Sequence, residues 1–347
     1  MSQERVAVAM SGGVDSSLAA ARLKQAGYDV SGIYMKLWSD PNLAQTVSHL
    51  EHTCQILGVP FYELDLQAEF HRLVIDYFCH EYSLGKTPNP CVVCNQQVKF
   101  GLLLDMALER GAEYLATGHY ARLERSSDGY RLLKATDESK DQSYFLYTLG
   151  QRQLKHLMFP LGELSKQKVR GLAGELGLPA SSRRDSQDIC FIPDKDYRSF
   201  LTEHIPLKAG DIVDITGKVL GKHNGLAQYT VGQRHGLGLT SSREFYVLRL
   251  DAENNRLVVG DKDQLLHNRL VARKLSWVSG GVPKESIGVK VKVRYKATEV
   301  AAELHPKNSI AEVHFLKPQM AITPGQSVVF YQGDVVLGGG VIDAVLC

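Results

Sequence analysis

Short apolar runs alternate with helically spaced apolar residues along the first part of the chain. Four runs have the length and composition of buried strands, at 5–10, 29–35, 60–65 and 113–117. Apolar residues three or four positions apart predict helices at 16–26, 43–57, 67–80, 95–110 and 166–176. Strands and helices that alternate in this way predict a doubly wound parallel sheet with helices on both faces.

The pattern changes after about residue 205 to short alternating runs separated by turns. One hairpin is predicted to turn at Thr216-Gly217, and a second at Asn254-Asn255 between 245–250 and 256–259. Beyond residue 264 only short strands are expected, which favours a small β-barrel or sandwich. We therefore expect an α/β domain at 1–204, a small β-rich linking domain at 205–263 and a C-terminal β-barrel at 264–347.

Composition and charge narrow the class of protein. The 347 residues are 44% hydrophobic and 22% charged, as in ordinary globular proteins. No apolar run approaches the roughly 20 residues of a membrane span, and the first ten residues lack a secretion signal, so a cytoplasmic protein is expected. The net charge is only +2, yet residues 264–347 hold ten Lys or Arg against six Asp or Glu. Positive charge is therefore concentrated in the predicted barrel.

The stretch SGGVDSS at 11–17 joins the first predicted strand to the first predicted helix. Glycines let a backbone close around a phosphate, and N–H groups at a helix start favour an anion. Ser11, Ser16 and Ser17 can donate hydrogen bonds, and Asp15 can hold Mg²⁺ near the phosphates. An ordinary glycine-rich turn is the alternative, but the length and position of the stretch favour a phosphate site. It is not a Walker A loop, because no Gly-Lys-Ser/Thr follows, and it is not a dinucleotide fingerprint, because the pattern Gly-x-Gly-x-x-Gly is absent.

Six scattered cysteines exclude a disulfide scaffold and point to redox or metal chemistry. Cys91 and Cys94 directly precede the helix predicted at 95–110, where backbone N–H groups should lower the pKa of a thiol. Cys190 follows almost a hundred residues later, beside a short apolar run. A structural zinc site is the main alternative for the pair, although no second Cys or His pair completes it. Cys54 and Cys79 fit core packing.

The glycine-rich stretch resembles the pyrophosphatase loop, or PP-loop, of enzymes that cleave ATP between its α and β phosphates. Seven more motifs follow in order: GKTPNPCVVCN at 85–95, ATGHY at 116–120, KDQSYFL at 140–146, SQDIC at 186–190, YTVGQR at 229–234, VRY at 293–295 and TPGQ at 323–326. Over its whole length, the chain thus resembles the tRNA-specific 2-thiouridylases, which place sulfur on the wobble uridine. The set of motifs is specific, although single motifs are not.

This resemblance implies an ATP-dependent reaction on tRNA, with Mg²⁺. ATP would adenylate the C2 oxygen of the wobble uridine, and Cys190 would carry a persulfide received from a cysteine desulfurase or a sulfur-relay protein. The terminal sulfur would attack C2 directly, or after its release by Cys94, and a Cys94–Cys190 disulfide would remain. A monomer is the default expectation.

The resemblance also assigns binding residues. Those implied to bind ATP are Ala9, Met10, Ser11, Gly12, Gly13, Val14, Asp15, Ser16, Met35 and Gly118. Those implied to meet the target base or the tRNA are Asn89, Pro90, Cys91, His119, Lys140, Asp141, Gln142, Arg294, Tyr295 and Gln326. For His119 we expect a neutral hydrogen-bonding ring rather than a catalytic base.

One position departs from the family pattern, because many members have Asp where this chain has Cys91. A thiol cannot copy a carboxylate at neutral pH unless its pKa falls well below about 8.5. Cys91, Cys94 and Cys190 instead make three soft ligands that suit an iron–sulfur cluster with one open iron. From the sequence, an iron–sulfur cluster and a persulfide mechanism without a cluster are equal alternatives.

Residues 289–296 alternate strictly between apolar and basic side chains. On a strand, this spacing places four positive charges on one face, where they could bind RNA phosphates, or merely keep a solvated edge soluble. The resemblance favours RNA. Two other functions compete with tRNA sulfur transfer: a PP-loop synthetase that adenylates a small molecule for amination, and a non-enzymatic ATP- and RNA-binding module. Neither one requires the distant pair Cys94 and Cys190.

Overall fold

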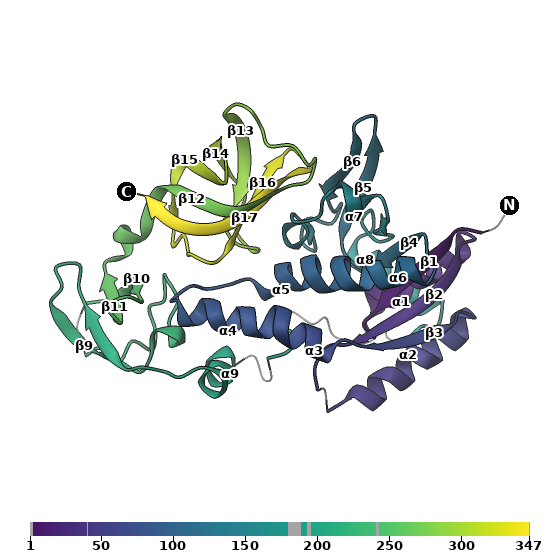
Figure 1. The fold of residues 1–347 in the computed structure, drawn as a ribbon, viewed down its shortest axis with the longest axis horizontal. Helices are drawn as coiled ribbons and strands as arrows, with labels where there is room; N and C mark the ends of the chain where they lie inside the picture. The colour runs from purple at the N-terminus through teal and green to yellow at the C-terminus, as the bar shows by residue number, and fades with distance from the viewer. Residues whose placement is uncertain (1–2, 40, 180–188, 193–195, 241–242, 347) are drawn as a thin grey trace.

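The computed structural model describes residues 3–39, 41–179, 189–192, 196–240 and 243–346 (Figure 1). Its first part holds a five-stranded parallel sheet in the order β3-β2-β1-β4-β7. The strands are β1 Arg5–Met10, β2 Asp29–Lys36, β3 Phe61–Asp65, β4 Tyr114–Thr117 and β7 Leu157–Met158. The predicted parallel sheet is confirmed, and only the two-residue β7 had no signal in the sequence. Because the strand order reverses beside β1, the carboxyl ends of β1 and β4 enclose the crevice where such sheets bind ligands.

Helices cover both faces of this sheet, as the alternating pattern predicts. Helices α1 Val14–Gln25, α2 Leu43–Leu57 and α8 Lys166–Glu175 share one apolar core with Val6 and Val8 of β1. The other face, with Ala7 and Leu115, packs against helices in the region 67–109. Side chains on opposite faces of β1 therefore enter two different cores.

Two long helical segments lie side by side and run from the sheet toward the barrel (Figure 1). The first consists of α3 Gln67–Phe70, a π-helical turn His71–Ile75 and α4 Asp76–Ser83. The second consists of α5 Pro90–Val93, a π-helical stretch Cys94–Leu103 and α6 Leu104–Glu109. Our expected start at residue 95 was wrong, because the helix begins at Pro90. Asn89 takes the extended conformation before it, and proline is well tolerated at a first helical position.

The two β-rich regions match the expected architecture. A small sheet of order β10-β11-β8-β9 is built from β8 Gly210–Val213, β9 Val219–His223, β10 Tyr246–Asp251 and β11 Arg256–Gly260, preceded by α9 Tyr197–His204. The C-terminal region contains β12 Leu266–Trp277, β13 Ile287–Lys292, β14 Val300–Lys307, β15 Ile310–Met320, β16 Ser327–Gln332 and β17 Val335–Leu346. These strands pair in the order β12-β15-β14-β13-β16-β17, and β12 also pairs with β17, which closes a barrel of six strands.

A hairpin from the first part of the chain extends the barrel sheet. Strands β5 Ala121–Ser126 and β6 Gly129–Lys134 lead to the short α7 Gln151–Leu154, and β6 pairs with β17 through Leu133 and Val335. The barrel residues Val329 and Tyr331 belong to the same apolar core as the long helices. The barrel is therefore packed directly onto the α/β part. None of the helices in the described ranges is both long and apolar enough to cross a membrane.

Candidate nucleotide and thiol site

The predicted phosphate loop lies at the carboxyl end of β1 and leads directly into α1. Gly12 has a φ of 76°, a conformation that glycine adopts without strain. The Ser16 hydroxyl accepts a hydrogen bond from the Ser11 backbone N–H at 3.1 Å and donates to the Gly13 carbonyl at 3.2 Å. Ala9 and Met10 end β1, and Met35 lies near the end of the adjacent β2. The residues expected to bind ATP thus gather at one edge of the sheet.

Asp15, in the first turn of α1, is the charged group of this loop. Its carboxylate accepts hydrogen bonds from the Lys166 ammonium at 2.7 and 2.8 Å and from the Tyr120 hydroxyl at 2.8 Å. Carboxylate oxygens are ligands that Mg²⁺ prefers, with phosphate oxygens supplying further positions, so this residue fits the expected metal. Lys166 was not predicted from the sequence. Its only signal there is its position at the start of a predicted helix, where the helix dipole disfavours a cation.

The end of β4 closes against the phosphate loop. A Cβ atom added to Gly118 would lie 2.8 Å from the carbonyl carbon of Asp15 and from the backbone nitrogen of Ser16. The next residue, His119, pairs through Nδ1 with the Thr117 hydroxyl at 2.8 Å. Desolvation, and then the positive charge of Lys99, lower the pKa of His119 well below 6.5. A neutral ring is therefore favoured at this position.

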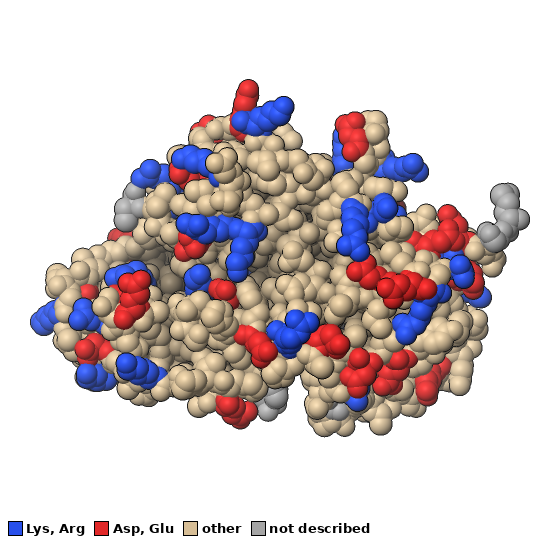
Figure 2. Space-filling view, viewed as in Figure 1, with Lys and Arg blue, Asp and Glu red and all other residues tan. Residues whose placement is uncertain are grey.

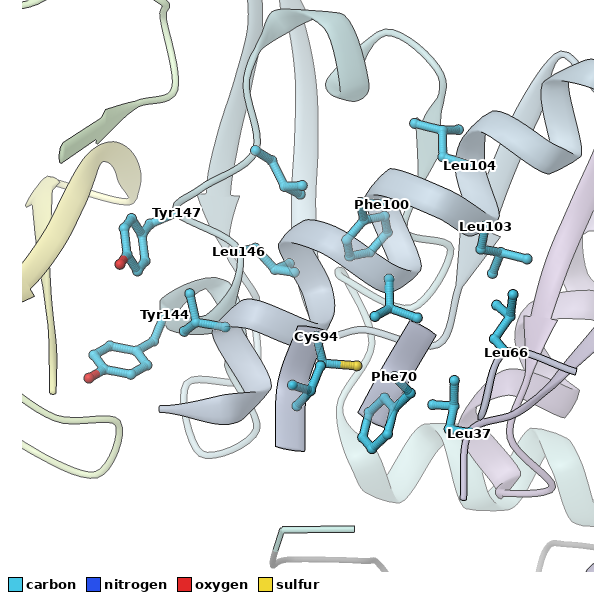
Figure 3. Packing of buried hydrophobic residues seen from close by; sticks show 14 of the residues in the cluster. Leu37, Leu66, Phe70, Cys94, Phe100, Leu103, Leu104, Tyr144, Leu146 and Tyr147 are labelled. Carbon is cyan, nitrogen blue, oxygen red and sulfur yellow. The ribbon is translucent and has the colours of Figure 1, made fainter. Parts of the chain in front are cut away.

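The cysteines differ from our expectation of a lowered pKa. Cys94 is buried in the first turns of the long helix, with its sulfur among apolar side chains that include Phe70 (Figure 3). Desolvation raises the pKa of its thiol, and it raises that of the half-buried Cys91 to about 11. The prediction from the helix start was wrong, because the loss of hydration disfavours a thiolate more than backbone dipoles favour it.

Cys190 belongs to the same region of the molecule. It is exposed, and the pKa of its thiol is raised, first by desolvation and then by repulsion from Cys94 and Cys91. The Cys91 and Cys94 pair and the distant Cys190 are therefore close enough to interact electrostatically. Of its motif SQDIC, residues 186–188 lie outside the described residues.

Lys99 is a second residue that sequence reasoning missed. Its positive charge lowers the pKa values of Cys91, Cys94 and Cys190, and it also acts on His119. The His119 ring also lies 5.7 Å from the ring of Phe100, which belongs to the same helix as Cys91 and Cys94. Since His119 follows the glycine that approaches the phosphate loop, this helix adjoins the loop. A lysine five residues after a Cys-x-x-Cys pair, in the same helix, was the available signal.

The three thiols were also expected to suit an iron–sulfur cluster. Within the described ranges, no group of three His, Cys, Asp or Glu side chains is arranged to hold a metal ion. Cys190 is accessible and Cys94 is buried, and such a pair of sulfurs can also take part in thiol–disulfide chemistry.

Several residues expected to meet tRNA make internal contacts. The Asp141 carboxylate is 4% exposed and accepts hydrogen bonds from the Ala135 and Ser143 backbones. The Gln142 side chain accepts from the backbone N–H of Tyr120 at 2.9 Å. The Gln326 amide donates to the carbonyl of Thr87 at 2.9 Å. Lys140 donates its backbone N–H to Asp137 in the same loop as Asp141 and Gln142. Gln326 therefore contacts the segment that precedes the helix of Cys91 and Cys94 (Pro90–Glu109, here the thiol helix), and Gln142 contacts the segment that follows β4.

The alternating segment 289–296 is not one continuous strand. Strand β13 ends at Lys292, and Arg294 and Tyr295 lie in the turn that follows it. Lys292 faces inward and pairs with Asp141 at 3.7 Å, while the Tyr295 ring packs 4.3 Å from that of Phe145. The prediction that all four basic side chains face outward is therefore wrong for Lys292, because its ammonium pairs with the buried Asp141 carboxylate of the α/β part. Lys290, Arg294 and Lys296 are exposed.

A cavity of about 310 Å³ separates the thiol helix from the barrel. Its walls carry the side-chain amides of Asn89, Gln96 and Gln97, together with Lys274 of β12. On the face shown in Figure 2, basic side chains border the recess beside the barrel, and acidic side chains gather over the α/β part. The cavity thus has partly polar walls that include one lysine.

Three protein-family profiles match successive parts of the chain. The tRNA methyl transferase HUP domain matches residues 4–194, the tRNA methyl transferase PRC-barrel domain 198–261, and the aminomethyltransferase beta-barrel domain 267–342. A tRNA-specific 2-thiouridylase MnmA 1 of Caldanaerobacter subterraneus subsp. tengcongensis is 46% identical over 98% of both chains. A tRNA-specific 2-thiouridylase MnmA of Geobacter metallireducens is 46% identical over 99% of this chain and 98% of its own. Among solved structures, the U34-tRNA thiolase NcsA of Methanococcus maripaludis is only weakly similar, with a TM-score of 0.36 and 17% identity over 58% of this chain and 64% of its own.

Proposed function

The chain belongs to the tRNA-specific 2-thiouridylase family, and from this membership we propose that it is an ATP-dependent sulfurtransferase that converts the wobble uridine of tRNA to 2-thiouridine. The observation that carries the proposal is the joint site of the phosphate loop and the Cys94 and Cys190 thiols, which lie 96 positions apart in the sequence. An enzyme that both adenylates its substrate and transfers sulfur needs this combination.

The first half-reaction activates the uridine. Residues 9–16, with Met35 and Gly118, would bind ATP, and Asp15 would hold Mg²⁺, which would supply positive charge beside the phosphates. The C2 oxygen attacks the α phosphorus, the bond to the β phosphate breaks, and pyrophosphate leaves with the electron pair. The C2 oxygen then belongs to AMP, which is a good leaving group.

The second half-reaction supplies sulfur. Cys190 is exposed, so a cysteine desulfurase or a relay protein can load its thiol with a sulfane sulfur to give a persulfide. The terminal sulfur attacks C2, AMP leaves, and the Cys94 thiolate attacks the Cys190 sulfur to release the 2-thiouridine. The products are AMP, thiolated tRNA and a Cys94–Cys190 disulfide, which a cellular dithiol must reduce with two electrons. Lys99 favours the thiolate forms that these steps require.

Other residues of the site would hold the tRNA. Asn89, Pro90, Cys91, His119, Lys140, Asp141, Gln142, Arg294, Tyr295 and Gln326 would surround the target base or its neighbours. The internal contacts of Gln142 and Gln326 support a role in fixing the loops around the base.

The test is direct sulfur insertion under anaerobic conditions. Purified protein would be incubated with ATP, Mg²⁺, a persulfide donor or sulfide, and unmodified tRNA with a wobble uridine, and digested nucleosides would be analysed by mass spectrometry. We expect 2-thiouridine from the wild type and from a Cys54→Ala control, and none from Cys94→Ala or Cys190→Ala. Formation of AMP and pyrophosphate without 2-thiouridine would overturn the sulfur assignment and favour a PP-loop synthetase.

Cys91 separates the two sulfur routes. A persulfide route needs only Cys94 and Cys190 as reacting groups, so Cys91→Ala, which removes only a contact to the base or its neighbours, should still form 2-thiouridine. A cluster would need all three thiols, so loss of activity in this variant, together with bound iron in the wild type, would establish the cluster instead.

A further inference from the structure

A partly buried ion pair adjoins the phosphate loop, and its lysine has no part in the half-reactions above. The ammonium of Lys166 donates hydrogen bonds to both carboxylate oxygens of Asp15, at 2.8 and 2.7 Å, and the lysine is only 9% exposed. The partners are 151 positions apart, so the pair joins the start of α8 to the start of α1.

The surrounding contacts hold this ammonium in place. The Tyr120 hydroxyl donates to Asp15 at 2.8 Å, and the Lys166 ammonium lies 5.7 Å from the centre of the Tyr120 ring. The backbone N–H of Lys166 donates to Asp137 at 2.9 Å, and Ser165 caps the same helix. The lysine is therefore anchored from two sides.

Stability alone is a poor reason for this lysine. A cation in the first turn of a helix opposes the dipole, at a cost of about 0.3–1 kcal/mol. Burial of an ion pair removes hydration from both charges, and apolar residues of the same volume are often equally stable there. A fixed cation beside a loop that binds phosphates is better explained by a ligand with negative charge.

We propose that Lys166 binds the β or γ phosphate of ATP and stabilises the departing pyrophosphate. The inference rests on the proposed function in that it requires ATP cleavage between the α and β phosphates. As the bond to the β phosphate breaks, negative charge grows on the pyrophosphate oxygens, and an ammonium already in place stabilises it with little reorganisation. Lys166 keeps its proton throughout, so no proton transfer is added to the reaction. Asp15 is the resting partner of this ammonium and becomes a ligand of Mg²⁺ when the nucleotide arrives.

The test compares nucleotides that differ in their phosphates. Isothermal titration of ATP, pyrophosphate and AMP, each with Mg²⁺, would be carried out on wild type, Lys166→Met and Lys168→Met. The control Lys168 is an exposed lysine two positions along the same helix. We expect Lys166→Met to bind ATP and pyrophosphate at least about tenfold more weakly, since one charge-assisted hydrogen bond is worth about 1.5–3 kcal/mol. AMP affinity should stay within about twofold, and Lys168→Met should match the wild type for all three ligands. Unchanged ATP affinity, or an equal loss for AMP, would overturn the proposal.

Affinity labelling of the wild type keeps the test independent of folding defects. An adenosine polyphosphate that ends in a pyridoxal aldehyde forms an imine with a lysine at the phosphate site, and borohydride fixes it. Peptide mass spectrometry should find the label on Lys166, and both ATP and pyrophosphate should block it. Label on another lysine would refute the assignment. Neither experiment contains tRNA or a sulfur donor, so a failed thiolation assay and a failed Lys166 assignment remain distinguishable.

Discussion

Substitution of Gly118 by alanine is the sharpest perturbation of the nucleotide site. This glycine directly follows β4, where the chain packs closely against the start of α1. The added Cβ would lie 2.8 Å from the backbone of Asp15 and Ser16 and 2.9 Å from the Cβ of Asp15. Because the opposing atoms are mostly backbone, rotation of a side chain cannot relieve the contact.

The cost follows from these distances. Ordinary van der Waals contact begins near 3.4 Å, so β4 and the phosphate loop must separate by several tenths of an ångström. Extra atoms in a well-packed region destabilise a protein by about 1–3 kcal/mol. A shift of the loop also moves the groups that align the α phosphate, and a misplacement near 1 Å costs about a hundredfold in rate. We therefore expect ATP turnover to fall about tenfold or more.

The assay pairs this variant with Gly171→Ala. Gly171 lies within α8, and nothing lies within 4 Å of an added Cβ. Alanine should stabilise that helix by about 0.5–1 kcal/mol and leave turnover unchanged. Urea unfolding and AMP release would be measured for both variants. If Gly118→Ala retained wild-type stability and turnover, the close approach of β4 to the loop would be refuted.

Three further predictions follow from burial and charge. Lys99→Met should raise the pKa of Cys94 further and slow its alkylation at pH 8, measured by peptide mass spectrometry; an unchanged rate would contradict the assigned effect. Lys292→Met leaves the buried Asp141 carboxylate without its ion-pair partner, so the free energy of unfolding in urea should fall by about 3 kcal/mol. Adding Asp141→Asn to this variant should restore part of that loss, because the unpaired charge is then removed. The pKa of His119 is lowered in the folded protein, so below pH 6.5 the unfolded chain binds a proton at this residue that the folded protein does not bind. The free energy of unfolding should therefore fall on acidification, by at most about 1.4 kcal/mol per pH unit. A wild-type pH dependence in His119→Gln, from urea titrations at pH 7 and 5.5, would exclude this residue as its source.

Elements that depend on local spacing were predictable from the chain alone. The helix expected at 43–57 is α2 Leu43–Leu57, and Gly58 ends it with a left-handed conformation. Hairpin β5/β6 was not predicted, although six local pairs join its strands and Asp128-Gly129 at its turn is a hairpin signal. Only the attachment of β6 to β17, through Leu133 and Val335, depends on residues about two hundred positions apart.

The site divides in the same way. The phosphate loop and the order of the cysteine motifs were visible in the sequence, and they led to the right family. The direction of the pKa shift of the Cys94 thiol could not be predicted from the sequence, because it depends on which side chains bury this residue. Leu37 and Phe70 share its core, and neither is near it in the chain (Figure 3).

The sequence by itself determined the alternation of elements, the place of the phosphate loop after β1 and the presence of the two distant cysteines Cys94 and Cys190. The spacing of apolar residues and the positions of glycines act over only a few residues, so these features can be recognised from the sequence alone. Only the tertiary structure decided that Lys292 turns inward to Asp141, that Lys166 meets Asp15 beside the loop, and that the thiols lose their hydration. Desolvation and ion pairing depend on which groups come within a few ångströms of one another, and packing of distant segments sets those distances.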